Sequence, residues 1–209
     1  MVAIALGAHV FVIGLTGGIG AGKSEAGNIL RELGAVVIDA DKVAHLSYLP
    51  GTEAYEQLVA LFGTGILDDS GVVDRTKLGS IIFDDDVARK ALESIVWPAT
   101  RLWIENRLKD EEDRDTNIVV LEVPKLFESG WDDIADVVWT IEVSTINAIT
   151  RVQKRTGLSP WEVESRIEAQ MSNEQRSELA GLTINNDGDI GALRSRINEA
   201  WKSLPVNRE

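Results

Sequence analysis

Hydrophobic residues in this chain gather into five runs of strand length, separated by stretches in which apolar residues recur at helical spacing. The runs are Phe11 to Leu15, Ala35 to Ile38, Ile118 to Glu122, Val137 to Val143 and Leu182 to Asn185. Near-continuous apolar runs are typical of parallel strands that are covered on both faces. The alternation of strand and helix patterns therefore predicts an α/β fold with a parallel five-stranded sheet flanked by helices.

About eighty residues between the second and third runs carry helical patterns only. The expected helices are Lys42 to Tyr48, Glu53 to Phe62, Arg75 to Phe83 and Asp86 to Lys109, the last broken near Pro98. A crossover between parallel strands needs only about a dozen residues. This segment therefore predicts an inserted helical subdomain, which in such folds tends to bind substrate.

A second helical stretch follows the fourth run, from Thr145 to Ala180. Two capping boxes mark helix starts within it, Ser159 with Glu162 and Ser172 with Gln175. The segment is rich in arginine and locally close to neutral, which favours a lid over a phosphate-containing ligand.

The composition narrows the possible functions. The chain has 34 acidic and 21 basic residues, a formal charge of −13, which argues against binding to nucleic acid. With no cysteine, disulfides and Cys-built zinc sites are excluded, and a cytoplasmic enzyme fits.

The first 22 residues carry no charged side chain. A signal peptide would need a basic start, and a membrane span would not hold so many glycines. We interpret this segment as a buried strand followed by a glycine loop, with Met1 to His9 as a frayed extension.

The glycine loop carries the strongest chemical signal. Gly17-Gly18-Ile19-Gly20-Ala21-Gly22-Lys23-Ser24 matches the phosphate-binding loop (P-loop) pattern G-x-x-x-x-G-K-[ST] between a strand and a helix. Glycines let successive backbone N–H groups face one anion, and the helix N-terminus favours negative charge. Lys23 would reach the β- and γ-phosphates and Ser24 would bind Mg²⁺. The alternative is a strand-to-helix turn that merely uses glycines.

A P-loop predicts a ligand but no particular reaction, because GTPases, motors, transporters and small kinases share it. The chain lacks an N-K-x-D tetrapeptide for guanine, and it has no motor-sized second domain. A small-molecule kinase that uses ATP is the class that remains.

Such a kinase needs a carboxylate near the acceptor hydroxyl. Asp39 and Asp41 follow the second strand, at the edge where open α/β sheets bind ligands. One of them is expected to act in catalysis and the other to cap a helix, and the residues alone do not decide which. Glu122 ends the third strand and either helps to orient Mg²⁺ or only occupies a turn.

Arg151 and Arg155 are four residues apart and share a helix face. Their guanidinium groups are suited to gripping phosphate oxygens over the nucleotide, or alternatively pair with neighbouring glutamates. The six tryptophans predict packing, although Trp97 and Trp103 in the insert could alternatively contact a ring of the substrate.

Taken together, these motifs resemble the dephospho-CoA kinase family over about residues 11 to 200. The resemblance is carried by Gly14 to Ser24, Ile38 to Asp41 with Ala44, Pro50-Gly51, Ile82-Phe83, Pro98, Pro124 to Glu128, Arg155, Arg166, Ala169-Gln170, Arg176 and Asn186. The chain departs from the family pattern at Glu25, His45, Trp97, Lys125, Gly181 and Asn185. Glu25 can still offer its backbone N–H to a phosphate.

The resemblance implies ATP-dependent phosphorylation of the ribose 3′-hydroxyl of dephospho-CoA. It implies a P-loop fold in three parts: a nucleotide-binding core at about 10–41, 116–148 and 181–204, a CoA-binding helical insert at about 42–115, and a lid at about 149–180. It selects Asp41 as the base, with Lys23 and Arg155 on the transferring phosphoryl group. It adds no nucleic-acid or membrane partner and leaves the oligomeric state open.

Two other interpretations remain at this point. The chain could phosphorylate another nucleoside-like acceptor, which the departures in the insert would permit. It could also be a regulatory module that binds nucleotide without transferring phosphate, although such a module would be expected to lack the carboxylate or the lid arginine.

Overall fold

The computed structural model describes residues 10–83 and 85–206, and the expectation of a frayed extension at Met1 to His9 lies outside these residues. The chain forms two compact units. The sheet unit runs to Ile38 and resumes at Glu111, and the helical unit comprises Asp39–Asp110. Each unit is described below by itself.

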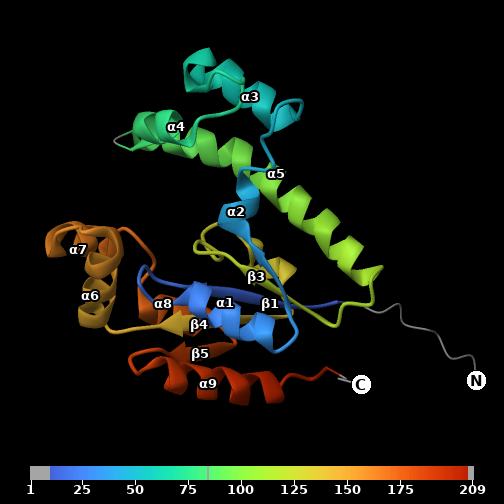
Figure 1. Cartoon of the computed structure of the whole chain (residues 1–209), viewed down its shortest axis with the longest axis vertical. Coiled ribbons are helices and arrows are strands. Elements are labelled where there is room, and N and C mark those ends of the chain that lie inside the picture. The colour runs from blue at the N-terminus through green and yellow to red at the C-terminus, as the bar shows by residue number, and fades with distance from the viewer. Residues whose placement is uncertain (1–9, 84, 207–209) are drawn as a thin grey trace, which may run out of the picture. The chain divides into compact units, whose positions relative to one another are not determined.

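The sheet unit is built on five strands in the order β2-β3-β1-β4-β5 (Figure 1). Their bounds are β1 Phe11–Gly17, β2 Val36–Asp39, β3 Ile118–Glu122, β4 Val137–Glu142 and β5 Leu182–Asn185. The β1–β3, β1–β4 and β4–β5 pairs are parallel. All five predicted strands are confirmed, and the central strands β1, β3 and β4 are largely buried, as their near-continuous apolar runs indicate.

Helices cover this sheet and connect its strands. α1 packs on β1 and β3 and beside α9, α9 packs on β5, and α8 packs on β4. Ile13, Leu15, Ile29, Trp139 and Ile197 are among the buried residues of the main core, each at most 2% exposed. The helices of this unit are α1 Lys23–Glu32, α6 Thr145–Thr156, α7 Pro160–Glu168, α8 Asn173–Leu179 and α9 Ile190–Lys202, with the 3-10 turn η2 at Trp131–Ile134.

Both predicted capping boxes are confirmed in the second helical stretch. The Ser159 hydroxyl accepts from the backbone of Glu162 at the start of α7, and Ser172 accepts from Gln175 at the start of α8. In each case the side chain at the third helical position bonds back to the capping residue. These reciprocal bonds divide the stretch into separate short helices.

The helical unit has its own small core of Leu58, Ile66, Val73 and Leu78. Its helices are α2 Ala40–Ala44, α3 Glu53–Phe62, α4 Arg75–Ile82 and α5 Asp86–Glu112, with the 3-10 turn η1 at Thr64–Ile66. An isolated antiparallel bridge joins Leu67 and Val73, so the segment is not helical throughout.

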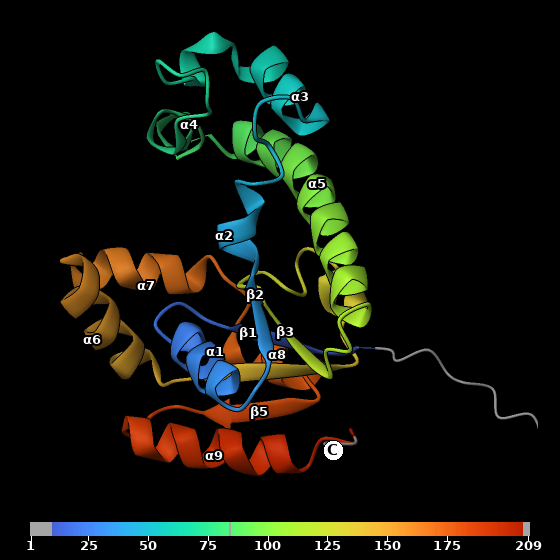
Figure 2. The ribbon, with the colours of Figure 1, turned by 45° about the vertical axis from the view of Figure 1, so that its right-hand side comes forward.

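The expectations for Pro98 and Trp161 are also wrong. The helix does not break near Pro98, because α5 runs through this proline from Asp86 to Glu112, 27 residues in all (Figure 2). A proline removes one backbone donor and strains the preceding turn, but packing along a long helix can outweigh that cost. Trp161 is also not a packing residue, since it lies 72% exposed on α7.

Candidate nucleotide site

The P-loop connects β1 to α1 in the conformation that its glycines allow. Gly20 has φ 74° and Gly22 has φ 94°, and Gly22 is the N-cap of α1. A side chain at Gly22 would be strained by this φ and would also collide with the Asn186 amide. The loop therefore depends on glycine for its backbone conformation and for the close approach of a neighbouring side chain.

Lys23 directs its ammonium group back onto this loop. Its Nζ donates to the carbonyl of Gly17 at 2.8 Å and approaches that of Gly18 at 3.4 Å. These carbonyls hold the cation beside the loop whose N–H groups would face a phosphate. The predicted phosphate-contacting lysine thus lies at the loop, at the N-terminus of α1.

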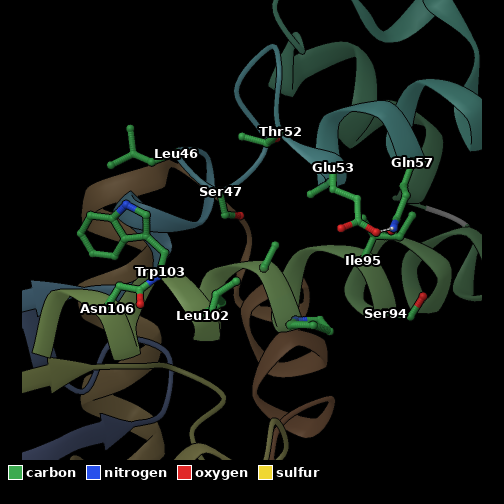
Figure 3. Close-up of a pocket in the computed structure, with 13 residues that line it drawn as sticks. Leu46, Ser47, Thr52, Glu53, Gln57, Ser94, Ile95, Leu102, Trp103 and Asn106 are labelled. Atoms are coloured by element: carbon green, nitrogen blue, oxygen red, sulfur yellow. Dashed lines mark hydrogen bonds between the residues drawn. The ribbon is translucent and has the colours of Figure 1, made fainter. Parts of the chain in front are cut away.

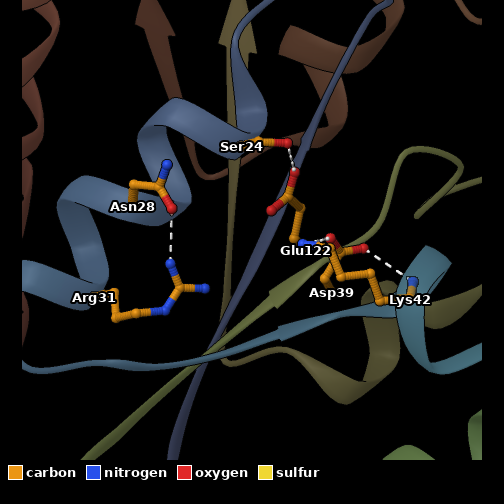
Figure 4. A network of polar contacts seen from close by, with 6 residues as sticks. All are labelled: Ser24, Asn28, Arg31, Asp39, Lys42 and Glu122. Carbon is orange, nitrogen blue, oxygen red and sulfur yellow. Dashed lines mark hydrogen bonds and ion pairs between the residues drawn. The ribbon is translucent and has the colours of Figure 1, made fainter.

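Ser24 and Glu122 meet at the carboxyl end of the sheet. The Ser24 hydroxyl donates to Oε1 of Glu122 at 2.9 Å (Figure 4). The parallel register places Glu122 opposite Leu15, shortly before the P-loop, and Glu122 is 7% exposed. Glu122 thus ends β3 as expected, and its carboxylate contacts the hydroxyl of the predicted Mg²⁺ ligand Ser24, so a role in orienting the ion stays a prediction.

This pair fits a magnesium ion in chemical type. Mg²⁺ prefers oxygen ligands and usually takes only one or two from the protein, with the rest from phosphates and water. A hydroxyl and a carboxylate side by side provide that set. Among the described residues no cluster of three or more His, Asp or Glu side chains forms a separate metal site.

Three side chains from distant parts of the chain also contact the P-loop, and the sequence reasoning gave none of them a role. Gln170 Oε1 accepts from the backbone N–H of Ile19 at 2.9 Å, and Asn186 Nδ2 donates to the carbonyl of Ala21 at 2.7 Å. The third, Arg176, lies against Gly18. Gln170 is 151 residues from Ile19, so no local pattern could reveal the contact.

The two arginines of α6 have different surroundings. Arg151 donates from Nη2 to the backbone carbonyl of Asn186 at 2.7 Å, so it is held by the β5–α9 connection and not by a glutamate. Arg155 is exposed near the end of α6, and no ion pair joins it to another described residue. Arg155 is therefore accessible to a ligand, whereas Arg151 connects α6 to the β5–α9 connection.

A shallow pocket of about 380 Å³ lies beside the P-loop. Its lining consists of Gly22, Glu25, Arg151, Asn186, Gly188, Ile190 and Leu193. The pocket thus combines residues of the P-loop and of the β5–α9 connection, and its lining includes one basic residue, one acidic residue and two aliphatic residues.

Asp187 ties the β5–α9 connection to the start of α6. Its Oδ1 accepts from the backbone and hydroxyl of Ser144 at 2.8 and 2.7 Å and from Asn147 at 2.8 Å, while Oδ2 accepts from Asn185 at 3.0 Å. These donors, led by the Ser144 hydroxyl, hold the pKa of Asp187 well below its usual range. The carboxylate thus anchors the first of the helices that follow β4.

In the helical unit, Asp39 is confirmed as a helix cap. It is the N-cap of α2, accepts from the backbone N–H of Lys42 at 3.2 Å and pairs with the Lys42 ammonium at 2.9 Å (Figure 4). Asp41 lies in the first turn of α2 and is exposed. The catalytic role that the family resemblance implies for Asp41 stays a prediction at this point.

The helical unit also contains a pocket of about 570 Å³ (Figure 3). Leu46 and Trp103 lie at one end of it, and Glu53, Gln57 and Ile95 lie at the other. Glu53 accepts from the Gln57 amide at 2.9 Å. Among the described residues that line it, none is a lysine or arginine. Such a lining suits an uncharged ligand group with both apolar and hydrogen-bonding parts.

Within the described residues, no helix combines the length and the apolar character needed to cross a bilayer.

Known proteins resemble this chain over most of its length. A curated dephospho-CoA kinase of Geobacter sulfurreducens is 45% identical over 91% of this chain and 96% of its own. That of Symbiobacterium thermophilum is 43% identical, covering 92% of this chain and 80% of its own. The solved structure of TT1252 from Thermus thermophilus has a TM-score of 0.78 and 32% identity, over 94% of this chain and 98% of its own.

The fold is shared more widely than the sequence. Shikimate kinase from Acinetobacter baumannii has a TM-score of 0.53 at 16% identity, covering 93% of each chain, a likeness of fold alone. The sequence model of the dephospho-CoA kinase family matches residues 11–192. With this match and relatives above 40% identity, the chain belongs to the dephospho-CoA kinase family.

Proposed function

We propose that this protein transfers the γ-phosphoryl group of ATP to the ribose 3′-hydroxyl of dephospho-CoA, giving coenzyme A and ADP. The observation that carries the proposal is a P-loop with Lys23 and the Ser24–Glu122 pair in place, in a chain that belongs to the dephospho-CoA kinase family. The fold alone would not select this acceptor, because shikimate kinases have it too.

In the reaction, the P-loop residues Gly17, Gly18, Ile19, Gly20, Ala21, Gly22, Lys23, Ser24 and Glu25 bind the polyphosphate, mainly through backbone N–H groups. Lys23 exchanges the carbonyls of Gly17 and Gly18 for phosphate oxygens. Ser24 and Glu122 would hold Mg²⁺, directly or through water, and the ion would neutralise charge on the β- and γ-phosphates.

Asp41 is the proposed base. Its carboxylate accepts the proton of the 3′-hydroxyl as the oxygen attacks the γ-phosphorus, and the bond from that phosphorus to the β,γ-bridging oxygen breaks. Arg155 is proposed to close over the transferring group and to stabilise its charge through its planar fork. Its exposure and its lack of an ion pair among the described residues support this role.

The two pockets are proposed to hold the uncharged parts of the substrates. The pocket beside Gly22 is proposed for the adenine of ATP, because Arg151 can stack on a ring and Ile190 and Leu193 offer apolar contact. The pocket of the helical unit is proposed for an uncharged portion of dephospho-CoA, since its described lining has no cation for a pyrophosphate. The helical unit would then be the CoA-binding part, and α6 to α8 the lid.

The decisive experiment is acceptor-dependent consumption of ATP by the purified protein. Dephospho-CoA is expected to stimulate ADP formation strongly and to yield coenzyme A, whereas adenosine and shikimate are not. Stimulation by one of the other acceptors alone would contradict the assignment. No acceptor-dependent turnover, with ATP still bound, would favour a nucleotide-binding regulatory module. We also propose a cytoplasmic location, in keeping with the absence of cysteine.

A further inference from the structure

Arg176 is a charged side chain inside the sheet unit. It lies on α8 and is 4% exposed. One amine of its guanidinium, Nη2, donates to Oδ1 of Asn173 at 3.0 Å, and Asn173 in turn donates to the carbonyl of Val143 at 3.1 Å. Its Nε is buried and has no hydrogen-bond partner among the described residues.

The charge of Arg176 is not compensated by a direct ion pair. No carboxylate of the described residues lies within 4.0 Å of its guanidinium. Burial lowers the pKa of Arg176, while Glu128, Glu142 and Glu174 oppose this shift from further away. An arginine remains charged even so, and a buried charge without a partner costs free energy.

This buried charge faces the P-loop. A Cβ placed on Gly18 would lie 2.7 Å from Arg176 Nη2, so the guanidinium occupies the space where a side chain at that position would be. On the same residue, the Gly18 carbonyl is 3.4 Å from the ammonium of Lys23. Two cations therefore converge on the first turn of a loop that binds anions.

We propose that Arg176 is a phosphate-binding residue, whose guanidinium contacts the polyphosphate of the bound nucleotide. The nucleotide supplies the negative charge that the protein around Arg176 lacks. Arginine suits this position better than lysine because Asn173 fixes one amine while the rest of the planar fork can face phosphate oxygens. The inference rests on the proposed function only in taking ATP as the phosphoryl donor.

A purely structural role makes opposite predictions. If Arg176 only stabilised the conformation of the loop, its removal would destabilise the free protein. The affinity for every ligand of the site would then fall by a similar factor. If it is a phosphate-binding residue, its removal relieves the free protein of a buried charge without an ion pair among the described residues, so the stability of the free protein does not fall. The affinity falls only for ligands that carry a phosphate chain.

The test is calorimetric titration of Arg176→Met and Arg176→Lys with ATP, inorganic tripolyphosphate and adenosine, together with the melting temperature of each free protein. We expect Arg176→Met to lower the affinity for ATP and for tripolyphosphate by at least about tenfold, and to leave the affinity for adenosine within about twofold of the wild-type value. The melting temperature of the free variant should be no lower than that of the wild type. Arg176→Lys should recover part of the lost affinity because it retains the charge. The matched control is Arg31→Met, an exposed arginine on α1 whose side chain donates to Asn28 Oδ1 at 2.7 Å.

The proposal is overturned if ATP and tripolyphosphate bind Arg176→Met as they bind the wild type. It is also overturned if the affinity for adenosine falls as much as the affinity for ATP. A variant that melts well below the wild type, or that does not fold, would overturn it too. Arg176→Lys decides independently, since a folded variant with unchanged affinity for tripolyphosphate would leave no role for the fork. These measurements use no acceptor, so they stay valid even if dephospho-CoA proves not to be the substrate.

Discussion

The hydroxyl of Ser24 donates a 2.9 Å hydrogen bond to the buried carboxylate of Glu122, joining the first turn of α1 to the end of β3. The two residues are 98 positions apart in the chain. Their contact depends on the parallel pairing of β1 with β3, which brings the end of one strand beside the P-loop that follows the other.

Glu122→Gln should impair the use of magnesium. The amide keeps the shape and can still bond Ser24, but it removes the negative charge that would orient the ion or its water. We expect the Mg²⁺ concentration for half-maximal turnover to rise by about tenfold or more, in line with other residues that position metal ligands. Magnesium titrations of the steady-state rate measure this, with the exposed Glu178→Gln as control. An unchanged magnesium requirement would remove Glu122 from the metal site.

Asp41→Asn should abolish most turnover while ATP still binds. Loss of a general base typically costs about 100-fold or more in rate, and Asp41 takes no part in the P-loop. Asp39→Asn is the matched control because asparagine is also a good N-cap, so α2 should persist with near-normal turnover. Rates and ATP affinities of both variants decide the point. Wild-type turnover in Asp41→Asn, or equal losses in both variants, would contradict the assignment.

Trp103→Ala should weaken the binding of the acceptor, dephospho-CoA, and leave the binding of the donor, ATP, unchanged. Trp103 lines the pocket of the helical unit, and the loss of its apolar surface is expected to raise the KM for dephospho-CoA by about tenfold, or roughly 1.4 kcal/mol. The KM for ATP should stay constant. Trp161→Ala, at a 72% exposed tryptophan, is the control and should change neither value. An equal rise in both KM values would indicate general damage instead of a lost acceptor contact.

Asp187→Asn should make the protein less sensitive to acid. The folded-state pKa of Asp187 is lowered by Ser144, Asn147 and Asn185, so the folded state holds fewer protons at this group than the unfolded state. Its stabilising contribution is therefore present above the unfolded pKa of about 4 and is lost as the pH falls toward the folded value. Since the group is exposed, solvent screening keeps the effect modest.

The melting temperature from pH 3 to pH 7 measures this effect. The variant should melt below the wild type at pH 7, and the gap should narrow as the pH falls below about 4. Asp113→Asn, an exposed carboxylate, should show no such narrowing. A gap that stays constant over this range would mean that the lowered pKa of Asp187 contributes nothing to stability.

Local signals in the sequence were sufficient for much of the fold. The five strands follow from apolar runs, and the starts of α7 and α8 follow from their capping boxes. The same local reasoning failed at Pro98, where packing along a long helix outweighs the cost of a proline. It failed again at Trp161, because an apolar side chain carries no signal of whether it will be covered.

The candidate site divides in the same way. The P-loop motif predicts Lys23 as a phosphate-binding residue and Ser24 as a metal ligand, since the loop is continuous in the chain and its glycines act locally. The motif could not indicate that Gln170, Asn186 and Arg176 hold or flank the loop. Polar residues of these types are usually solvated, and only their contacts with Ile19, Ala21 and Gly18 in the folded chain place these three beside the P-loop.

The sequence by itself determined the five strands, the P-loop and a family resemblance, because each is encoded by residues close together or in a recurring order. Only the tertiary structure decided that Glu122 contacts Ser24, that Asp39 caps α2, and that Arg176 is buried beside Gly18. The physical reason is that burial and hydrogen bonding depend on which distant segments pack together. Parallel pairing brings the carboxyl ends of separate strands to one edge, where residues far apart in the chain become neighbours.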